Sequence, residues 1–134
     1  MSTSLRSELS MKNRYYIPKH RYLELKHFCL QYPGWKRKYN YYSFLHPVSE
    51  LRIQNGTGEH ADTTFVDAAK LATLSWKMRM VEECAKDAGE DLSELLLKAV
   101  TEGLSYSIIN PPCCKEAWYT MYRKFYALLD IVRG

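Results

Sequence analysis

The chain has 134 residues, 46% of them hydrophobic, which is enough to build one buried core without crosslinks. No apolar stretch approaches the roughly 18 residues needed to cross a bilayer, and residues 1–12 lack the apolar run of a secretory signal, so a soluble protein is expected. The net charge of +4 is uneven: residues 1–60 hold ten Lys or Arg against four acids, and residues 61–134 hold nine against eleven.

Residues 1–12 are predicted to be a flexible tail, and residues 13–134 a single all-α domain of about five or six helices. The first part, 13–45, is predicted to be a basic and aromatic helical hairpin. Pro18 suits a first helical turn, and Pro33 ends that helix and opens the next one. The apolar positions of the two helices recur at three- and four-residue steps: Tyr22, Leu25, Phe28, Cys29, then Trp35, Tyr39, Tyr42.

Cations alternate with these aromatic residues. Lys and Arg neutralise phosphates, so the mixture suits a nucleic-acid surface. The candidate phosphate contacts are Lys19, Arg21, Lys36, Arg37 and Lys38. The ordinary alternative is that the rings form the core and the cations form the solvated face.

Residues 46–61 lose the periodicity and carry Pro47 and Gly56, which predicts a loop. Residues 62–88 predict the longest helix, capped by Asp62 or Thr63 and ended near Gly89 in left-handed geometry. Its predicted apolar stripe is Phe65, Ala69, Ala72, Trp76, Met80 and Cys84.

Residues 91–131 predict a helix-turn-helix-like unit. Asp91 or Ser93 starts a helix that ends at Gly103, a short second helix follows from Ser105, and a proline turn at residues 111–114 leads into the last helix. The first of these helices is predicted to bury Leu92, Leu95, Leu96 and Val100. The last helix is predicted to pack through Trp118, Tyr122, Phe125 and Leu129, widened by Tyr119 and Tyr126. The candidate DNA-binding residues are Ser105, Lys115, Glu116, Thr120, Arg123 and Lys124. A terminal amphipathic helix with a charged face is the ordinary alternative.

The runs Leu97–Tyr106 and Trp118–Asp130 resemble small phage and prophage proteins of Gram-positive bacteria, which are similar in turn to ArpU/RinA-type late-transcription regulators and to region four of bacterial sigma factors. The segment Tyr15–Trp35 resembles the front end of the same group. The likeness covers about half of the chain. In those relatives the helix before the turn has roughly ten residues, whereas residues 105–110 leave about six here, and Pro112 limits the helix further.

The resemblance implies a phage-encoded DNA-binding transcriptional regulator in the cytoplasm of the bacterial host. Ser105 would cap its second helix, and Lys115, Glu116, Trp118, Tyr119, Tyr122 and Arg123 would lie on or beside the recognition helix. The expected partners are double-stranded DNA, with host RNA polymerase or another host protein, and a homodimer is compatible with this function. The alternative is a helical protein-interaction module that inhibits or redirects a host nucleic-acid-handling protein, such as a polymerase or a nuclease, including a CRISPR effector.

No catalytic motif occurs in the sequence, so an enzyme is not expected, and neither is a cofactor or a metal. Four cysteines occur, Cys29, Cys84, Cys113 and Cys114, and their spacing predicts free thiols. A Cys-Cys-His site that uses His27 stays open as an alternative.

Overall fold

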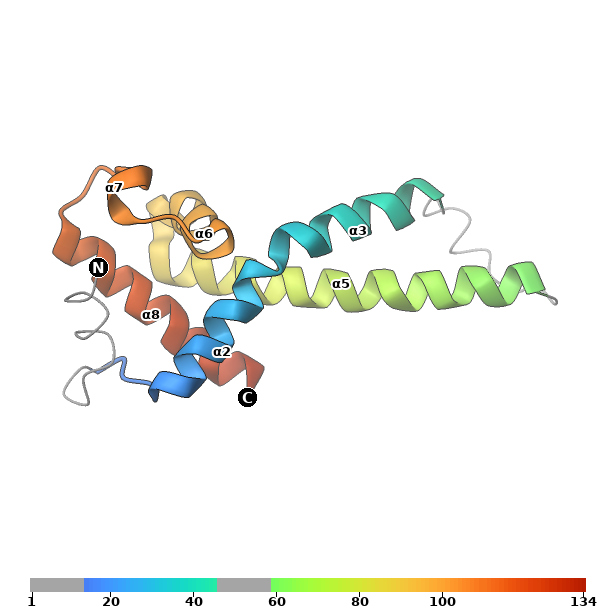
Figure 1. The fold of residues 1–134 in the computed structure, drawn as a ribbon, viewed down its shortest axis with the longest axis horizontal. Helices are drawn as coiled ribbons and strands as arrows, with labels where there is room; N and C mark the ends of the chain where they lie inside the picture. Colours follow the sequence, from blue (N-terminus) through green and yellow to red (C-terminus); the bar gives the residue numbers. More distant parts are fainter. Residues whose placement is uncertain (1–13, 46–58) are drawn as a thin grey trace. The chain divides into compact units, whose positions relative to one another are not determined.

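The computed structural model describes residues 14–45 and 59–134, with side chains in the second range from Asp67 onward. Every regular element of these residues is helical, which confirms the all-α prediction. In chain order they are α2 (Lys19–Leu30), α3 (Tyr32–Leu45), α5 (Glu59–Gly89), the 3-10 turn η1 (Glu90–Leu92), α6 (Ser93–Glu102), α7 (Tyr106–Ile109) and α8 (Lys115–Arg133) (Figure 1). None of the helices described is long and apolar enough to cross a membrane. The predicted tail and residues 46–58 of the predicted loop lie outside the described residues.

The chain divides into two compact units. Unit 1 combines residues up to Gln31 with Met80–Gly134, and unit 2 is Tyr32–Arg79. Residues 13–134 are predicted as one domain, with α2 and α3 as a hairpin, but the division falls between these two helices. Helix α2 packs instead on α6 and α8.

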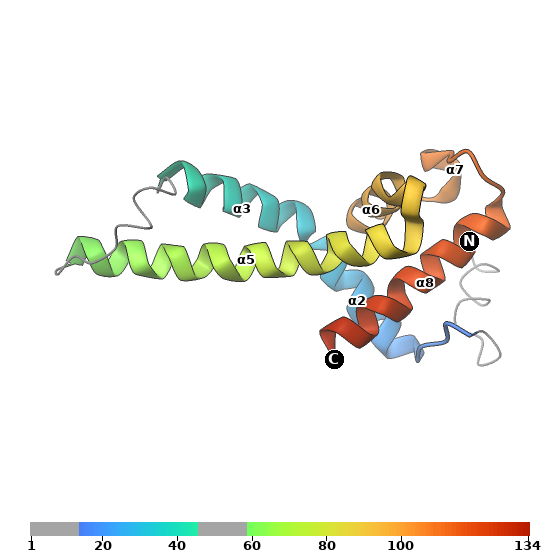
Figure 2. The ribbon, with the colours of Figure 1, turned by 180° about the vertical axis from the view of Figure 1, so that it is seen from behind.

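Unit 1 has an aliphatic and aromatic core drawn from α2, the end of α5, α6 and α8 (Figure 2). Its largest fully buried side chains are Trp118, Phe125, Leu25, Leu96, Leu129, Val81, Val100 and Cys29. Burying an aliphatic or aromatic side chain of this size stabilises the fold by about 1.5–3 kcal/mol. The core therefore fixes α8 through several turns, and α7 contributes no buried residue to it.

Unit 2 contains α3 and the first part of α5. The ammonium of Lys77 lies 5.6 Å from the ring centroid of Trp35, and that of Lys70 lies 5.4 Å from the ring centroid of Tyr42. Because the later residue of one helix pairs with the earlier residue of the other, the two helices run antiparallel. Both views show them side by side (Figures 1 and 2).

The stripe predicted for α5 is wrong in its first part. Ala69 and Ala72 are exposed and Trp76 is 60% exposed, whereas Met80 and Cys84 are buried. The side chain of Phe65 lies outside the described set. A four-residue step overshoots one turn by about 40°, so a stripe chosen mostly with such steps drifts around the helix. The face turned inward alternates four- and three-residue steps: Asp67, Leu71, Leu74, Met78, Val81, Ala85 and Ala88.

Both predicted ends of α5 also need correction. The helix begins at Glu59, so Asp62 and Thr63 lie inside it rather than at its cap. At the other end Gly89 is right-handed (φ −99°), and the left-handed residue is Glu90 (φ 49°). A Cβ on Gly89 would lie 3.2 Å from Cδ2 of Leu96, so glycine serves close packing of α5 on α6. The predicted caps of α6 are also absent, because its cap position is Leu92 and no side chain bonds there.

Candidate nucleic-acid interface

The connection from α6 to α7 follows the prediction. Gly103 is left-handed (φ 67°, ψ 36°), and the amide of Leu104 donates to the carbonyl of Ala99 at 3.0 Å. This geometry ends a helix by satisfying a free carbonyl, and glycine adopts it without steric cost. Ser105 then caps α7, because its Oγ accepts from the amide of Ile108 at 3.4 Å. Helix α7 is a single turn and ends at left-handed Asn110.

The turn between α7 and α8 is held by two hydrogen bonds. The amide of Cys113 donates to the carbonyl of Pro111 at 2.8 Å, and the hydroxyl of Tyr106 donates to the carbonyl of Cys113 at 2.7 Å. Cys114 occupies the cap of α8, where its Sγ accepts from the amide of Ala117 at 3.4 Å. This capping role was not predicted, because cysteine is not among the favoured cap residues. The start of α8 is thus fixed in direction.

The inner face of α8 confirms the predicted packing residues. Trp118, Phe125, Tyr126 and Leu129 are buried, and Tyr119 and Tyr122 are partly buried. The tyrosines form a chain of ring contacts whose centroids lie 5.0–6.5 Å apart: Tyr106 to Tyr119, Tyr119 to Tyr122, Tyr122 to Tyr126, and Tyr126 to Tyr22. Such aromatic pairs add stability beyond their burial. They bind α8 to the α7 turn on one side and to α2 on the other.

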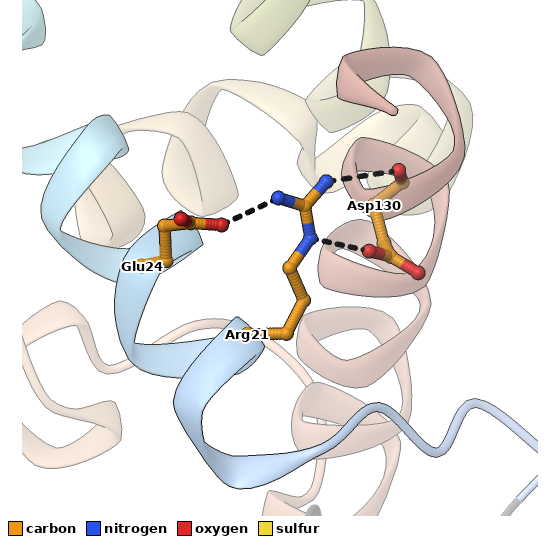
Figure 3. Close-up of polar contacts among 3 residues, drawn as sticks. All are labelled: Arg21, Glu24 and Asp130. Carbon is orange, nitrogen blue, oxygen red and sulfur yellow. Dashed lines mark hydrogen bonds and ion pairs between the residues drawn. The ribbon is translucent and has the colours of Figure 1, made fainter.

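A charged contact completes the attachment of α8 to α2. In Figure 3 the guanidinium of Arg21 lies between Glu24 on its own helix and Asp130 on α8. Its Nε donates to Oδ1 of Asp130 at 2.6 Å, and Nη2 donates to the Asp130 carbonyl at 3.3 Å. The hydrogen bond to Asp130, followed by that to Glu24, raises the pKa of Arg21. Arg21, a candidate phosphate contact, therefore already has two carboxylate partners.

The outer face of α8 near its start carries several of the candidate DNA-binding residues. Lys115, Glu116 and Thr120 are exposed, and so is Ala117, which is not among the candidate residues. Glu116, Ala117, Thr120 and Lys124 lie within about 100° of one another around the helix. Lys115 is exposed at the first residue of α8. We call these five residues the α8 outer face.

Arg123 occupies a different position from Lys124. Its Nη2 donates to Oγ1 of Thr120 at 3.2 Å, and its side chain lines a small hollow with Tyr15 and Ile17. Lys124 is partly buried, and its ammonium forms no ion pair with the carboxylates described. The α8 outer face therefore relies on Lys115 and Lys124 for positive charge.

Acidic residues dominate the preceding elements of unit 1. From Glu82 to Glu102 the chain holds seven acids against Lys86 and Lys98. A polyanion is repelled by such a segment. Of the surfaces of unit 1, the start of α8 is thus better suited to an anionic partner than the end of α5, η1 or α6.

The other candidate phosphate contacts are divided between the two units. Lys19 is exposed at the first residue of α2 in unit 1. Lys36, Arg37 and Lys38 are exposed on α3, in unit 2. The candidate phosphate contacts therefore fall into two groups, Lys19 and Arg21 in unit 1 and the three cations of α3 in unit 2.

All four cysteines are free thiols. Burial raises the pKa of Cys29 well above its ordinary value and that of Cys84 to about 11. Cys114 is exposed. Within the described residues no three His, Cys, Asp or Glu side chains gather as a metal site would require.

Comparison with known proteins adds no identification, since no family model, curated protein or solved structure matches the chain.

Proposed function

We propose that the protein is a duplex-DNA-binding transcriptional regulator, with α7 and α8 as a helix-turn-helix-like unit and α8 as the recognition helix. The observation that carries this proposal is the α8 outer face, where Ala117 and Thr120 are small and exposed, Lys124 lies one turn beyond Thr120, and Lys115 is exposed at the first residue of the helix. Small side chains permit close approach to base edges, and Ala and Thr methyl groups pack on the methyl of thymine.

In this proposal Lys115 and Lys124 neutralise phosphates, and Glu116 accepts a hydrogen bond from the amino group of a cytosine. Ala117 and Thr120 are the residues that approach the base edges. Ser105, outside this face, caps α7 and so holds it against the DNA backbone. The single turn of α7 limits the backbone contacts that this helix can supply. The sequence resemblance to ArpU/RinA-type regulators supports action in the cytoplasm of a bacterial host, as a monomer or a homodimer.

The test is selection of a duplex from a random library, followed by band-shift titration at several salt concentrations. Lys124→Ala is expected to reduce the slope of log K against log salt by about one, and Thr120→Glu to abolish sequence preference. Lys98→Ala, an exposed change on α6, is the matched control and is expected to leave both unchanged. A protein that leaves every duplex unshifted at micromolar concentration and low salt would refute the proposal.

A second candidate function is a protein-interaction module that acts on a host nucleic-acid-handling protein. Trp76 favours it, because this large ring is 60% exposed on α5, beside the exposed Ala69 and Ala72. Tryptophan is enriched among residues that anchor interfaces. Purified host RNA polymerase is the first partner to test by surface binding. A complex that is lost with Trp76→Glu and kept with Lys124→Ala supports this function, and the absence of a complex opposes it.

A further inference from the structure

The outward side of α3 carries a row of solvent-exposed side chains. Arg37, Tyr41 and Phe44 recur at four- and three-residue steps, so one lies on each successive turn. All three are exposed, Tyr41 by 60% and Phe44 by 84%. Lys36 and Lys38 flank the row. We call these five residues the α3 outer face.

The opposite side of α3 holds the helix in place within unit 2. Tyr32 and Trp35 are buried, and their rings meet edge to face at 6.5 Å. Lys77 and Lys70 of α5 lie over the rings of Trp35 and Tyr42. Lys70 and Lys77 of α5 thus make contacts inside the unit, while the three consecutive cations of α3 face solvent.

This packing also orients the exposed ring of Tyr41. Its centroid lies 5.7 Å from that of Tyr42 with the planes at 67°, an edge-to-face contact. Tyr42 is in turn covered by Lys70. Tyr41 therefore presents a supported ring to solvent, which reduces the entropy lost when a flat partner binds to it.

The charge of the helix is complementary to an anion. No acidic residue occurs among the fourteen residues of α3, and Lys36, Arg37 and Lys38 form no ion pair within the part of the chain that the structure describes. A chain of phosphates would neutralise all three cations in succession and release its counterions. An acidic side chain on a protein partner would neutralise only one of these three cations.

The exposed rings distinguish a single strand from a duplex. Bases stack on aromatic side chains when they are free of a partner strand, whereas a duplex keeps its base faces inside. The row also disfavours a membrane surface, because surface helices bury a broad apolar face, whereas the exposed large apolar side chains of α3 are Tyr41, Phe44 and Leu45, all within its last five residues.

We propose that the α3 outer face binds single-stranded nucleic acid, with bases stacked on Tyr41 and Phe44 and phosphates neutralised by Lys36, Arg37 and Lys38. This site belongs to unit 2 and does not rest on the duplex-binding role of α8. DNA and RNA share the required chemistry, since the face offers no side chain dedicated to the 2′-hydroxyl.

The experiment is fluorescence anisotropy of the full chain with labelled twelve-nucleotide oligo(dT) and oligo(U), compared with a duplex of the same length. Both single strands are expected to bind with comparable affinity and more tightly than the duplex. Tyr41→Ala and Phe44→Ala should each weaken binding by about tenfold, because one stacked base contributes about 1–3 kcal/mol. Tyr41→Phe, which keeps the ring, should bind like the parent chain.

Controls separate this site from the other proposals. Trp76→Ala removes an exposed ring on α5 and should leave single-strand affinity unchanged, as should Lys124→Ala on α8. Circular dichroism confirms that each variant keeps its helices. Equal affinity for the duplex, unaltered binding by the ring variants, or ring-dependent binding to phosphatidylglycerol vesicles without oligonucleotide binding would each overturn the proposal.

Discussion

The pairing of Arg21 with Asp130 gives a quantitative test of how α8 is held. The two residues are 109 positions apart, and their contact joins α2 to the last turns of α8. The perturbation is Arg21→Met, which keeps the aliphatic stem and removes the guanidinium. Asp130→Asn and the double variant complete a cycle that isolates the interaction between the two side chains.

The magnitude follows from exposure and geometry. A hydrogen bond to a charged group contributes about 1.5–3 kcal/mol when it is shielded, and an exposed ion pair contributes about 0.2–1 kcal/mol. The side chains of Arg21 and Asp130 are 22% and 35% exposed, whereas that of Glu24 is 56% exposed. For Arg21 with Asp130 we expect a coupling of about 1 kcal/mol, at the upper end of the range for exposed ion pairs, because both side chains are partly shielded. For Arg21 with the more exposed Glu24 we expect about 0.3 kcal/mol, near the lower end of that range.

The cycle also predicts the direction in which Asp130→Asn changes stability once Arg21 is absent. Asp130 lies in the last turns of α8, where a negative charge opposes the helix dipole. Once Arg21 is replaced by Met, Asp130→Asn should therefore stabilise the protein slightly, although the same change destabilises the parent chain. Urea unfolding measures both effects, and a loss of 1 kcal/mol lowers the melting temperature by about 3–4 °C at this size.

The matched control is the cycle of Arg21→Met with Glu24→Gln. Equal couplings in the two cycles would refute the argument from exposure. A coupling to Asp130 close to zero would show that the attachment of α8 does not depend on this charge pair. The remaining explanation would be the buried apolar face and the tyrosine rings of α8.

Three further outcomes are expected. Tyr126→Phe should stabilise the protein by about 1 kcal/mol, because its hydroxyl is buried without a hydrogen-bond partner in the described residues. Tyr22→Phe should destabilise it by a similar amount, because that hydroxyl lies 3.2 Å from another tyrosine hydroxyl. In urea unfolding, a destabilised Tyr126→Phe or a stabilised Tyr22→Phe would contradict this. Gly103→Ala should cost about 1 kcal/mol through its left-handed backbone, and an unchanged unfolding midpoint would show that the turn adjusts freely. Burial raises the pKa of Cys84 from 9.0 to about 11, so its thiol stabilises the fold fully below pH 9 and this stability is lost as pH rises through 11. Alkaline unfolding of Cys84→Ala should therefore show a weaker pH dependence than that of the parent chain. At pH 8 the exposed Cys114 should be alkylated before Cys84, and equal reactivity of the two thiols would contradict this.

Local signals predicted the elements around α8 well. Gly103 and Ser105 were expected to end and begin helices because backbone geometry and capping act within a few residues, and the structure confirms both. The packing residues of α8 were also expected, since its large side chains repeat close to the helical period. These features depend on sequence neighbours alone.

The face of α5 was harder to predict because two kinds of residue obscure it. Asp67 is polar but buried, and Ala85 and Ala88 are small, so the inward row lacks a clear apolar repeat. Trp76 is apolar but exposed, so a prediction that takes every large apolar residue as buried places the stripe on the wrong side of α5. Gly89 followed a third pattern, in which contact with Leu96 rather than backbone freedom explains the glycine. Burial in each case depends on what another helix places opposite, which one helix's pattern does not contain.

Charged residues of the candidate site are hard to predict for a similar reason. Composition identified cations without distinguishing those already neutralised from those that face solvent. Arg21 is bound to carboxylates, one of them 109 residues away, and Arg123 donates to Thr120, whereas Lys36, Arg37 and Lys38 lie exposed on a helix without acids. Neutralising a phosphate with an arginine that must first leave a carboxylate costs the energy of that pair. The lysines of α8 and the cations of α3 should therefore dominate salt dependence, and Arg21→Met should alter stability far more than nucleic-acid affinity.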